Sequence, residues 1–182
     1  MENEKKKLRE DKLFLYANSL YALSIGKGEE FTSLNGYISL RSKLEKEGWL
    51  INITPEVGKS WVNWNWQIIV PDNEDYNTGM YGDNGEYKSS FKALEFSVIR
   101  ALELYVLYKT DVDQDLLNKI INKYKITKPL DNIKTVLDLI LFIEGRLIFL
   151  EPVDKECFNY VRTSGKEYIE YINKRIRKCL DV

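Results

Sequence analysis

The sequence contains no histidine, and its only cysteines are Cys157 and Cys179. Histidine is the commonest general base and the commonest metal ligand, so its absence removes most catalytic triads and most zinc sites. With so few cysteines and 44% hydrophobic residues, the chain is typical of a reduced compartment and not of a disulfide scaffold. Glycine-rich phosphate loops, nucleophile elbows and zinc-ligand spacings are also missing. We therefore expect no catalytic residues, no metal site and no cofactor, and a protein that is not an enzyme.

The chain also lacks an excess of charge and a long apolar run. It has 27 Lys and Arg against 28 Asp and Glu, a net charge of −1, whereas general polyanion binders and membrane-surface proteins carry a clear positive excess. The most apolar stretch, Val136–Leu150, is interrupted by Asp138, Glu144 and Arg146, so it is too short and too charged to span a bilayer. The first twelve residues include basic side chains but carry no apolar segment typical of a signal peptide. These features predict a soluble, cytoplasmic protein with no membrane partner.

Two segments alternate between apolar and polar residues, which is the pattern of half-buried antiparallel strands. In Trp49–Thr54 the odd positions Trp49, Ile51 and Ile53 are apolar, and in Trp61–Val70 every even position from 62 to 70 is apolar. Trp64 and Trp66 lie on that apolar face and are expected in the core. Residues 55–60 are expected to connect the two strands as a hairpin turn.

Apolar residues at helical spacing predict helices on both sides of these strands. The helix that follows a cap at Thr32 or Ser33 is expected to carry one stripe of residues: Leu34, Tyr37, Ile38, Arg41 and Leu44. Gly48 is expected in the left-handed conformation at its end. The other expected helices cover residues 8–25, residues 90–105, a segment that begins at Asp111 or Asp113, a segment from Asp131 to about Glu144, and a last helix capped by Ser164. A short third strand is expected around residues 85–88, and residues 147–150 are expected to be extended.

These elements predict an α+β fold with a three-stranded antiparallel sheet flanked by helices. Residues 33–108 follow the order α-β-β-β-α and form the expected core, with an N-terminal helix before it. Residues 111–182 form a mainly helical extension packed on this core, and residues 1–182 make a single domain.

The order of elements in residues 33–108 resembles the topology of the double-stranded-RNA-binding domain, which implies nucleic-acid binding as an alternative function. Such domains carry a lysine-rich run at the start of the last helix. Here Lys88 and Lys92 occupy that place, and Lys59 lies in the expected turn. Residues 34–108 carry seven basic and ten acidic side chains, so the segment repels a phosphate backbone overall. Nucleic-acid binding is therefore the less favoured hypothesis.

The favoured candidate site is a protein-binding surface on the wet face of the second strand. Trp61 lies on that face with Asn63, Asn65 and Gln67, and an exposed tryptophan beside amides is a common part of an interface hot spot. The equally favoured alternative is that Trp61 is a strand-end residue covered by a loop. The acidic segment 72–86 adds Tyr76 and Tyr81, and a loop of this length inside a compact domain is often functional. We expect the partner to be another protein or a second copy of the chain.

Part of the sequence resembles small uncharacterised proteins of Bacteroidetes phages and mobile elements. The resemblance covers residues 49–105 and rests on an aromatic strand hairpin, a tyrosine and a helix start: Trp64–Ile69, Tyr87, Phe91, Ala93-Leu94-Glu95 and Ala101-Leu102. It implies a phage or mobile-element origin. The protein would then be a virion or assembly component, or a modulator of a host system in the host cytoplasm.

Overall fold

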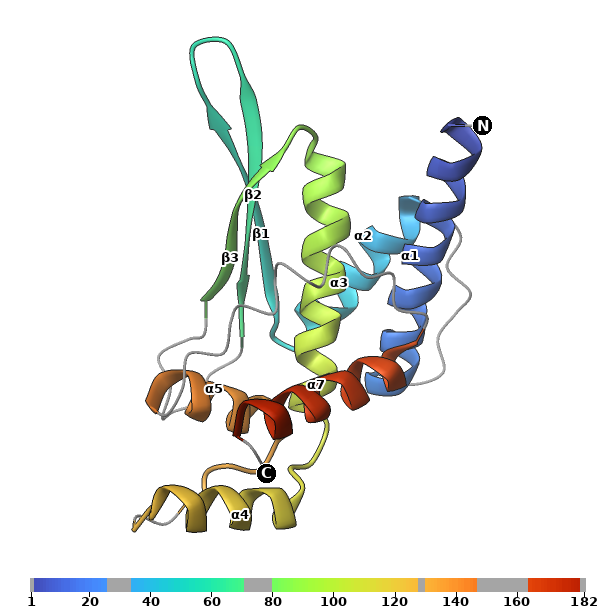
Figure 1. Cartoon of the computed structure of the whole chain (residues 1–182). Helices are drawn as coiled ribbons and strands as arrows, with labels where there is room; N and C mark the ends of the chain where they lie inside the picture. Colours follow the sequence, from blue (N-terminus) through green and yellow to red (C-terminus); the bar gives the residue numbers. More distant parts are fainter. Residues whose placement is uncertain (1, 26–33, 71–79, 128–129, 147–163, 181–182) are drawn as a thin grey trace. The chain divides into compact units, whose positions relative to one another are not determined.

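The computed structural model of the protein describes residues 2–25, 34–70, 80–127, 130–146 and 164–180 (Figure 1). The helices of this part are α1 (Glu2–Ser24), α2 (Leu34–Lys46), α3 (Ser90–Tyr108), α4 (Gln114–Tyr124), α5 (Val136–Arg146) and α7 (Gly165–Leu180). The strands are β1 (Leu50–Val57), β2 (Val62–Ile69) and β3 (Met80–Tyr87). The predicted α+β class is confirmed. The expected cap at Thr32 or Ser33 and the expected extended segment 147–150 lie outside the described residues.

Backbone contacts divide the chain into two compact units. The sheet unit is Lys27–Leu102, and the helical unit joins Met1–Gly26 to Glu103–Val182. The boundary therefore falls inside α3, and α1 belongs with the C-terminal helices. The arrangement of residues 1–182 as one domain stays a prediction.

The sheet has the order β1-β2-β3, and both neighbouring pairs are antiparallel. Ile51 lies opposite Ile68 and Ile53 lies opposite Trp66, so these apolar residues share one face. Ile51, Trp66 and Ile68 are buried, as the alternation predicts. The expected short strand at 85–88 is longer in the structure, because β3 begins at Met80.

A glycine cap fixes the path from α2 into β1. Gly48 has a φ of 87°, which confirms the expected left-handed conformation. The N–H of Gly48 donates to the backbone carbonyl oxygen of Glu45, and the N–H of Trp49 donates to that of Leu44, each at 3.0 Å. These two bonds form a Schellman motif. This turn places Trp49 in the core with no exposed surface.

The inward stripe expected for α2 is wrong at one position. Ile38 is 50% exposed, whereas Leu40 is fully buried together with Leu44. Residues 40 and 44 are four apart and lie on one helix face, and Tyr37 completes that face. Ile38 lies on the opposite side because it is two residues from Leu40.

Pro55, expected in the turn, lies inside β1. The Gly58 N–H donates to the Trp61 oxygen at 2.9 Å, so this pair is hydrogen-bonded across the end of the hairpin. Bonded and non-bonded pairs alternate along an antiparallel ladder, so Pro55 opposite Trp64 is a non-bonded pair. The nitrogen of Pro55 therefore points away from β2, to the free edge of the sheet, where proline is tolerated.

In the helical unit, the start of α7 lies against α1. Ser164 caps α7 as expected, because its Oγ accepts the Glu167 N–H at 3.3 Å. The Gly165 N–H donates to Ser19 Oγ of α1 at 2.9 Å. The apolar side chains buried on the two helices include Ala17, Leu20, Tyr168, Ile172 and Ile176.

The start of α5 differs from the prediction. The helix expected at Asp131 begins at Val136, and residues 130–134 form a turn and an irregular segment before it. Thr135 Oγ1 accepts the Asp138 N–H at 3.1 Å, and Asp138 Oδ2 accepts the Thr135 N–H at 2.8 Å. This reciprocal pair is a capping box, which satisfies donors that the first turn of a helix leaves unpaired. The motif Thr135-x-x-Asp138 therefore sets the start of α5, and Asp131 does not.

The close approach of α7 to α1 predicts that Gly165→Ala destabilises the protein. An added Cβ would lie 2.7 Å from Leu23 Cδ1 and 3.2 Å from Leu20 Cα, and the second of these is backbone that cannot rotate away. We expect the free energy of unfolding to fall by about 1–2 kcal/mol, measured by urea denaturation. Lys166→Ala, at the exposed neighbouring position, is the control. Equal stability of the two variants would contradict the tight contact.

Candidate functional site

The end of the β1–β2 hairpin extends beyond the third strand. The last pairing of β3 joins Tyr87 to Trp64, whereas β1 and β2 stay paired as far as Val57 and Val62 (Figure 1). Every residue of β1 from Thr54 to Val57 is exposed. The hairpin therefore ends in a two-stranded projection without a third strand beside it.

One face of this projection is apolar. Pro55 lies opposite Trp64 and Val57 lies opposite Val62, on the face that carries the half-buried Ile53 opposite the buried Trp66 further inward. Val57 is 71% exposed and Val62 is 47% exposed. We call Pro55, Val57, Val62 and Trp64 the projecting apolar face. The even-numbered residues of the second strand were predicted to be buried. This prediction is wrong at Val62, which is exposed; Trp64 is half-buried and Trp66 is buried.

Trp61 adds a large aromatic ring at the tip of the hairpin. Its side chain is 47% exposed, and its indole lies against Gly58. A Cβ at Gly58 would come within 2.8 Å of the indole Cδ2 and closer still to Nε1, so only glycine leaves room for the ring. Trp61 is therefore both exposed and held against its own turn.

The amides predicted beside Trp61 lie on the other, polar face of the hairpin. Asn63, Asn65 and Gln67 are half-buried and lie opposite Glu56, Thr54 and Asn52. Asn65 Nδ2 donates to Glu56 Oε2 at 3.3 Å, so part of this row is engaged within the hairpin. The role of these amides in binding a partner stays a prediction.

In the described part of the chain, neither of the two predicted tyrosines lies at this site. Tyr76 lies outside them. Tyr81 lies in β3 opposite Ile68, several ladder steps from the hairpin tip. The candidate site is therefore the projection alone.

The three lysines of the nucleic-acid hypothesis do not form a row. Lys92 Nζ pairs with Glu95 Oε2 at 2.6 Å, and the Glu95 side chain is 2% exposed. Lys59 and Lys88 are exposed. Lys59 follows the end of the β1–β2 ladder, whereas Lys88 follows Tyr87, the residue of β3 that pairs with Trp64, so the two lysines lie on different segments.

Within the described part of the chain, no three or more side chains of the metal-ligating types gather into a possible ion site. No helix in that part combines the length and the apolar character needed to cross a membrane. No protein-family model, curated protein or solved structure matches the chain. The assignment of a candidate site therefore rests on the geometry of the hairpin.

The contact between Gly58 and Trp61 predicts the effect of Gly58→Ala. The added methyl group displaces the indole, so the indole N–H resonance of Trp61 in a ¹H–¹⁵N spectrum should shift. The resonances of the buried Trp49 and Trp66 should stay in place. Trp61→Phe identifies the Trp61 peak by its loss. An unshifted Trp61 peak in Gly58→Ala would show that the ring does not lie on the turn.

Proposed function

We propose that the protein is a non-enzymatic binding protein that attaches to another protein through the projecting apolar face and Trp61. The observation that supports this proposal is the exposure of Val57 and Val62 on a face continuous with the core. Apolar surface that a folded protein leaves uncovered in one contiguous patch is typical of interaction sites.

The energetics of such a contact are adequate for specific binding. Burying an aliphatic side chain such as Val57 or Val62 contributes about 1.5–3 kcal/mol when it leaves water completely. Trp61 is of the residue type most enriched among interface hot spots. An isolated two-stranded ribbon is only marginally stable in water, so a partner that covers it also stabilises it.

The partner contacts the face of the hairpin and does not extend the sheet. Strand addition requires donors and acceptors along the free edge of β1. Pro55 has no N–H, and its nitrogen occupies one of the outward positions on that edge. A concave apolar surface on the partner fits the convex end of the hairpin.

The resemblance to small proteins of Bacteroidetes phages and mobile elements supports a choice of partner. On that basis the partner is a virion or assembly protein, or a host protein that the chain modulates in the cytoplasm. Self-association through the same face is included in the proposal as binding to a second copy.

The proposal predicts that Val57→Thr/Val62→Thr weakens partner binding about tenfold or more, because two apolar side chains leave the contact. Threonine keeps the β-branched shape and the strand preference, so the hairpin is retained. The matched control is Glu56→Thr/Asn63→Thr, the adjacent cross-strand pair on the polar face. Tagged versions of each full-length chain are used to capture partners from native lysate, and quantitative mass spectrometry compares the amounts.

Loss of the partners only in Val57→Thr/Val62→Thr supports the proposal. Loss only in Glu56→Thr/Asn63→Thr would move the site to the polar face with Asn63, Asn65 and Gln67. Equal retention in both variants would contradict binding through this hairpin.

The edge position of Pro55 predicts that Pro55→Thr promotes self-association. Threonine restores an outward N–H on β1 and favours the strand conformation, so two copies can pair edge to edge. We expect a larger apparent mass by size-exclusion chromatography with light scattering, growing with concentration. Glu56→Thr, which changes the same strand and keeps the proline, is the control. An unchanged mass for Pro55→Thr at all concentrations would show that the proline does not protect this edge.

A further inference from the structure

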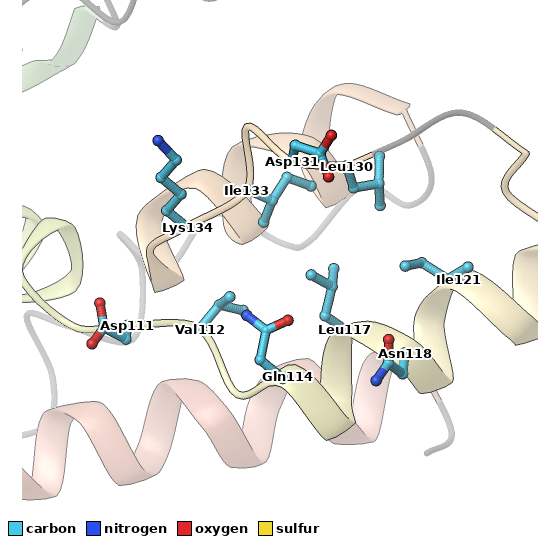
Figure 2. Close-up of a pocket in the computed structure, with 10 residues that line it drawn as sticks. All are labelled: Asp111, Val112, Gln114, Leu117, Asn118, Ile121, Leu130, Asp131, Ile133 and Lys134. Atoms are coloured by element: carbon cyan, nitrogen blue, oxygen red, sulfur yellow. The ribbon is translucent and has the colours of Figure 1, made fainter.

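A groove of about 640 Å³ lies in the helical unit, between α4 and the segment 130–134 (Figure 2). This volume falls within the range of about 300–1,000 Å³ of ligand-binding sites. The groove is far along the chain from the hairpin and uses none of its residues. It is therefore a second candidate site that does not depend on the first.

The floor of the groove is aliphatic. Val112, Leu117 and Ile133 line it and are at most 6% exposed, and the half-buried Ile121 and Leu130 continue it at one end. Leu117 of α4 and Ile133 of the facing segment point toward each other across the groove (Figure 2). The two sides of this apolar floor thus come from two separate segments of the chain.

Backbone hydrogen bonds hold the two sides in place. The Val112 N–H donates to the Lys134 oxygen and the Val136 N–H donates to the Thr110 oxygen, each at 2.9 Å. Asp113 caps α4 by accepting the Asp115 and Leu116 N–H groups, and Thr135 with Asp138 caps α5. A site whose walls are fixed in this way needs little rearrangement to bind.

The rim of the groove is polar and exposed. It consists of two carboxylates, two amides and one ammonium, from Asp111, Asp131, Gln114, Asn118 and Lys134. Among the described residues, these five side chains take part in no hydrogen bond or ion pair. The rim carries one more negative than positive charge, so it favours a cationic group over an anionic one.

We propose that this groove binds a short peptide segment of another protein, one that presents aliphatic side chains next to a lysine or arginine. The aliphatic side chains of the peptide lie against Ile121 and Leu130, the half-buried part of the apolar floor. The amides of Gln114 and Asn118 each offer a donor and an acceptor, which match the N–H and C=O of a peptide backbone. The carboxylates of Asp111 and Asp131 receive the basic side chain.

The test begins with a displayed library of random dodecapeptides selected on the full-length protein. We expect enriched sequences that combine aliphatic residues with lysine or arginine. The strongest peptide is then synthesised with a fluorescent label, and its affinity is measured by anisotropy.

Three variants locate the binding site of this peptide. Asn118→Trp fills the groove from an exposed helix position, and it should abolish binding. Asp111→Asn/Asp131→Asn should weaken binding about fivefold to tenfold and reduce its dependence on salt. Asp115→Asn removes an exposed carboxylate of α4 that does not line the groove, and should leave the affinity within about twofold. Circular dichroism confirms that each variant is folded.

Several outcomes would overturn the proposal. These are no enrichment, enrichment of acidic peptides, or a peptide that binds Asn118→Trp as well as the unmodified protein. Binding lost in Val57→Thr/Val62→Thr but kept in Asn118→Trp would assign the peptide to the hairpin and leave the groove without a ligand. Retained binding in the hairpin variant supports the groove independently of the proposed function.

Discussion

The structure depends on the burial of the second half of α3. Every side chain of α3 from Ser97 to Leu107 is buried, so this helix has no face that water can reach over that length. In the sheet unit, Phe91 and Phe96 of α3 meet the rings of Tyr37 and Tyr87. In the helical unit, the buried Glu103 accepts a hydrogen bond from Tyr16 at 2.8 Å, which satisfies a carboxylate that would otherwise be costly to bury. Each unit therefore builds part of its core on its own portion of one helix.

Local sequence patterns were enough to predict much of the sheet and several helix ends. The period-two alternation located β1 and β2 and their buried face, because Ile51, Trp66 and Ile68 follow it. Gly48 and Ser164 were identified from capping chemistry, which acts over only a few residues. The predictions that Ile38 faces inward and that α5 starts at Asp131 were wrong. The capping box of Thr135 and Asp138 was a sequence signal that could have corrected the second.

The candidate site could be predicted only in part. The alternation of apolar and polar residues identifies the apolar face of a strand, but it does not show how many residues of that face are buried by other elements. Val57 and Val62 have the pattern of core residues, yet they lie beyond the last pairing of β3 and are exposed. For Trp61 the sequence left exposure and coverage by a loop equally open, and the structure shows a ring that is 47% exposed and lies against Gly58. The groove was not predicted at all. Its two walls are brought together by the pairing of Asp111 with Thr135, and no local sequence pattern encodes this pairing. The same holds for the approach of α7 to α1.

That approach has a consequence for the newly made chain. Ser19 and Gly165 are 146 positions apart, so a ribosome that adds about 5–20 residues per second needs roughly 7–30 s to bring the start of α7 after α1. During this interval the face of α1 that carries Ala17 and Leu20 has no α7 to lie against. Contacts of such high sequence separation form slowly even in a finished chain. The nascent protein is therefore open to chaperones and to misassociation at its first helix, whose side chains Tyr16, Ala17, Leu20 and Tyr21 are buried once the chain has folded.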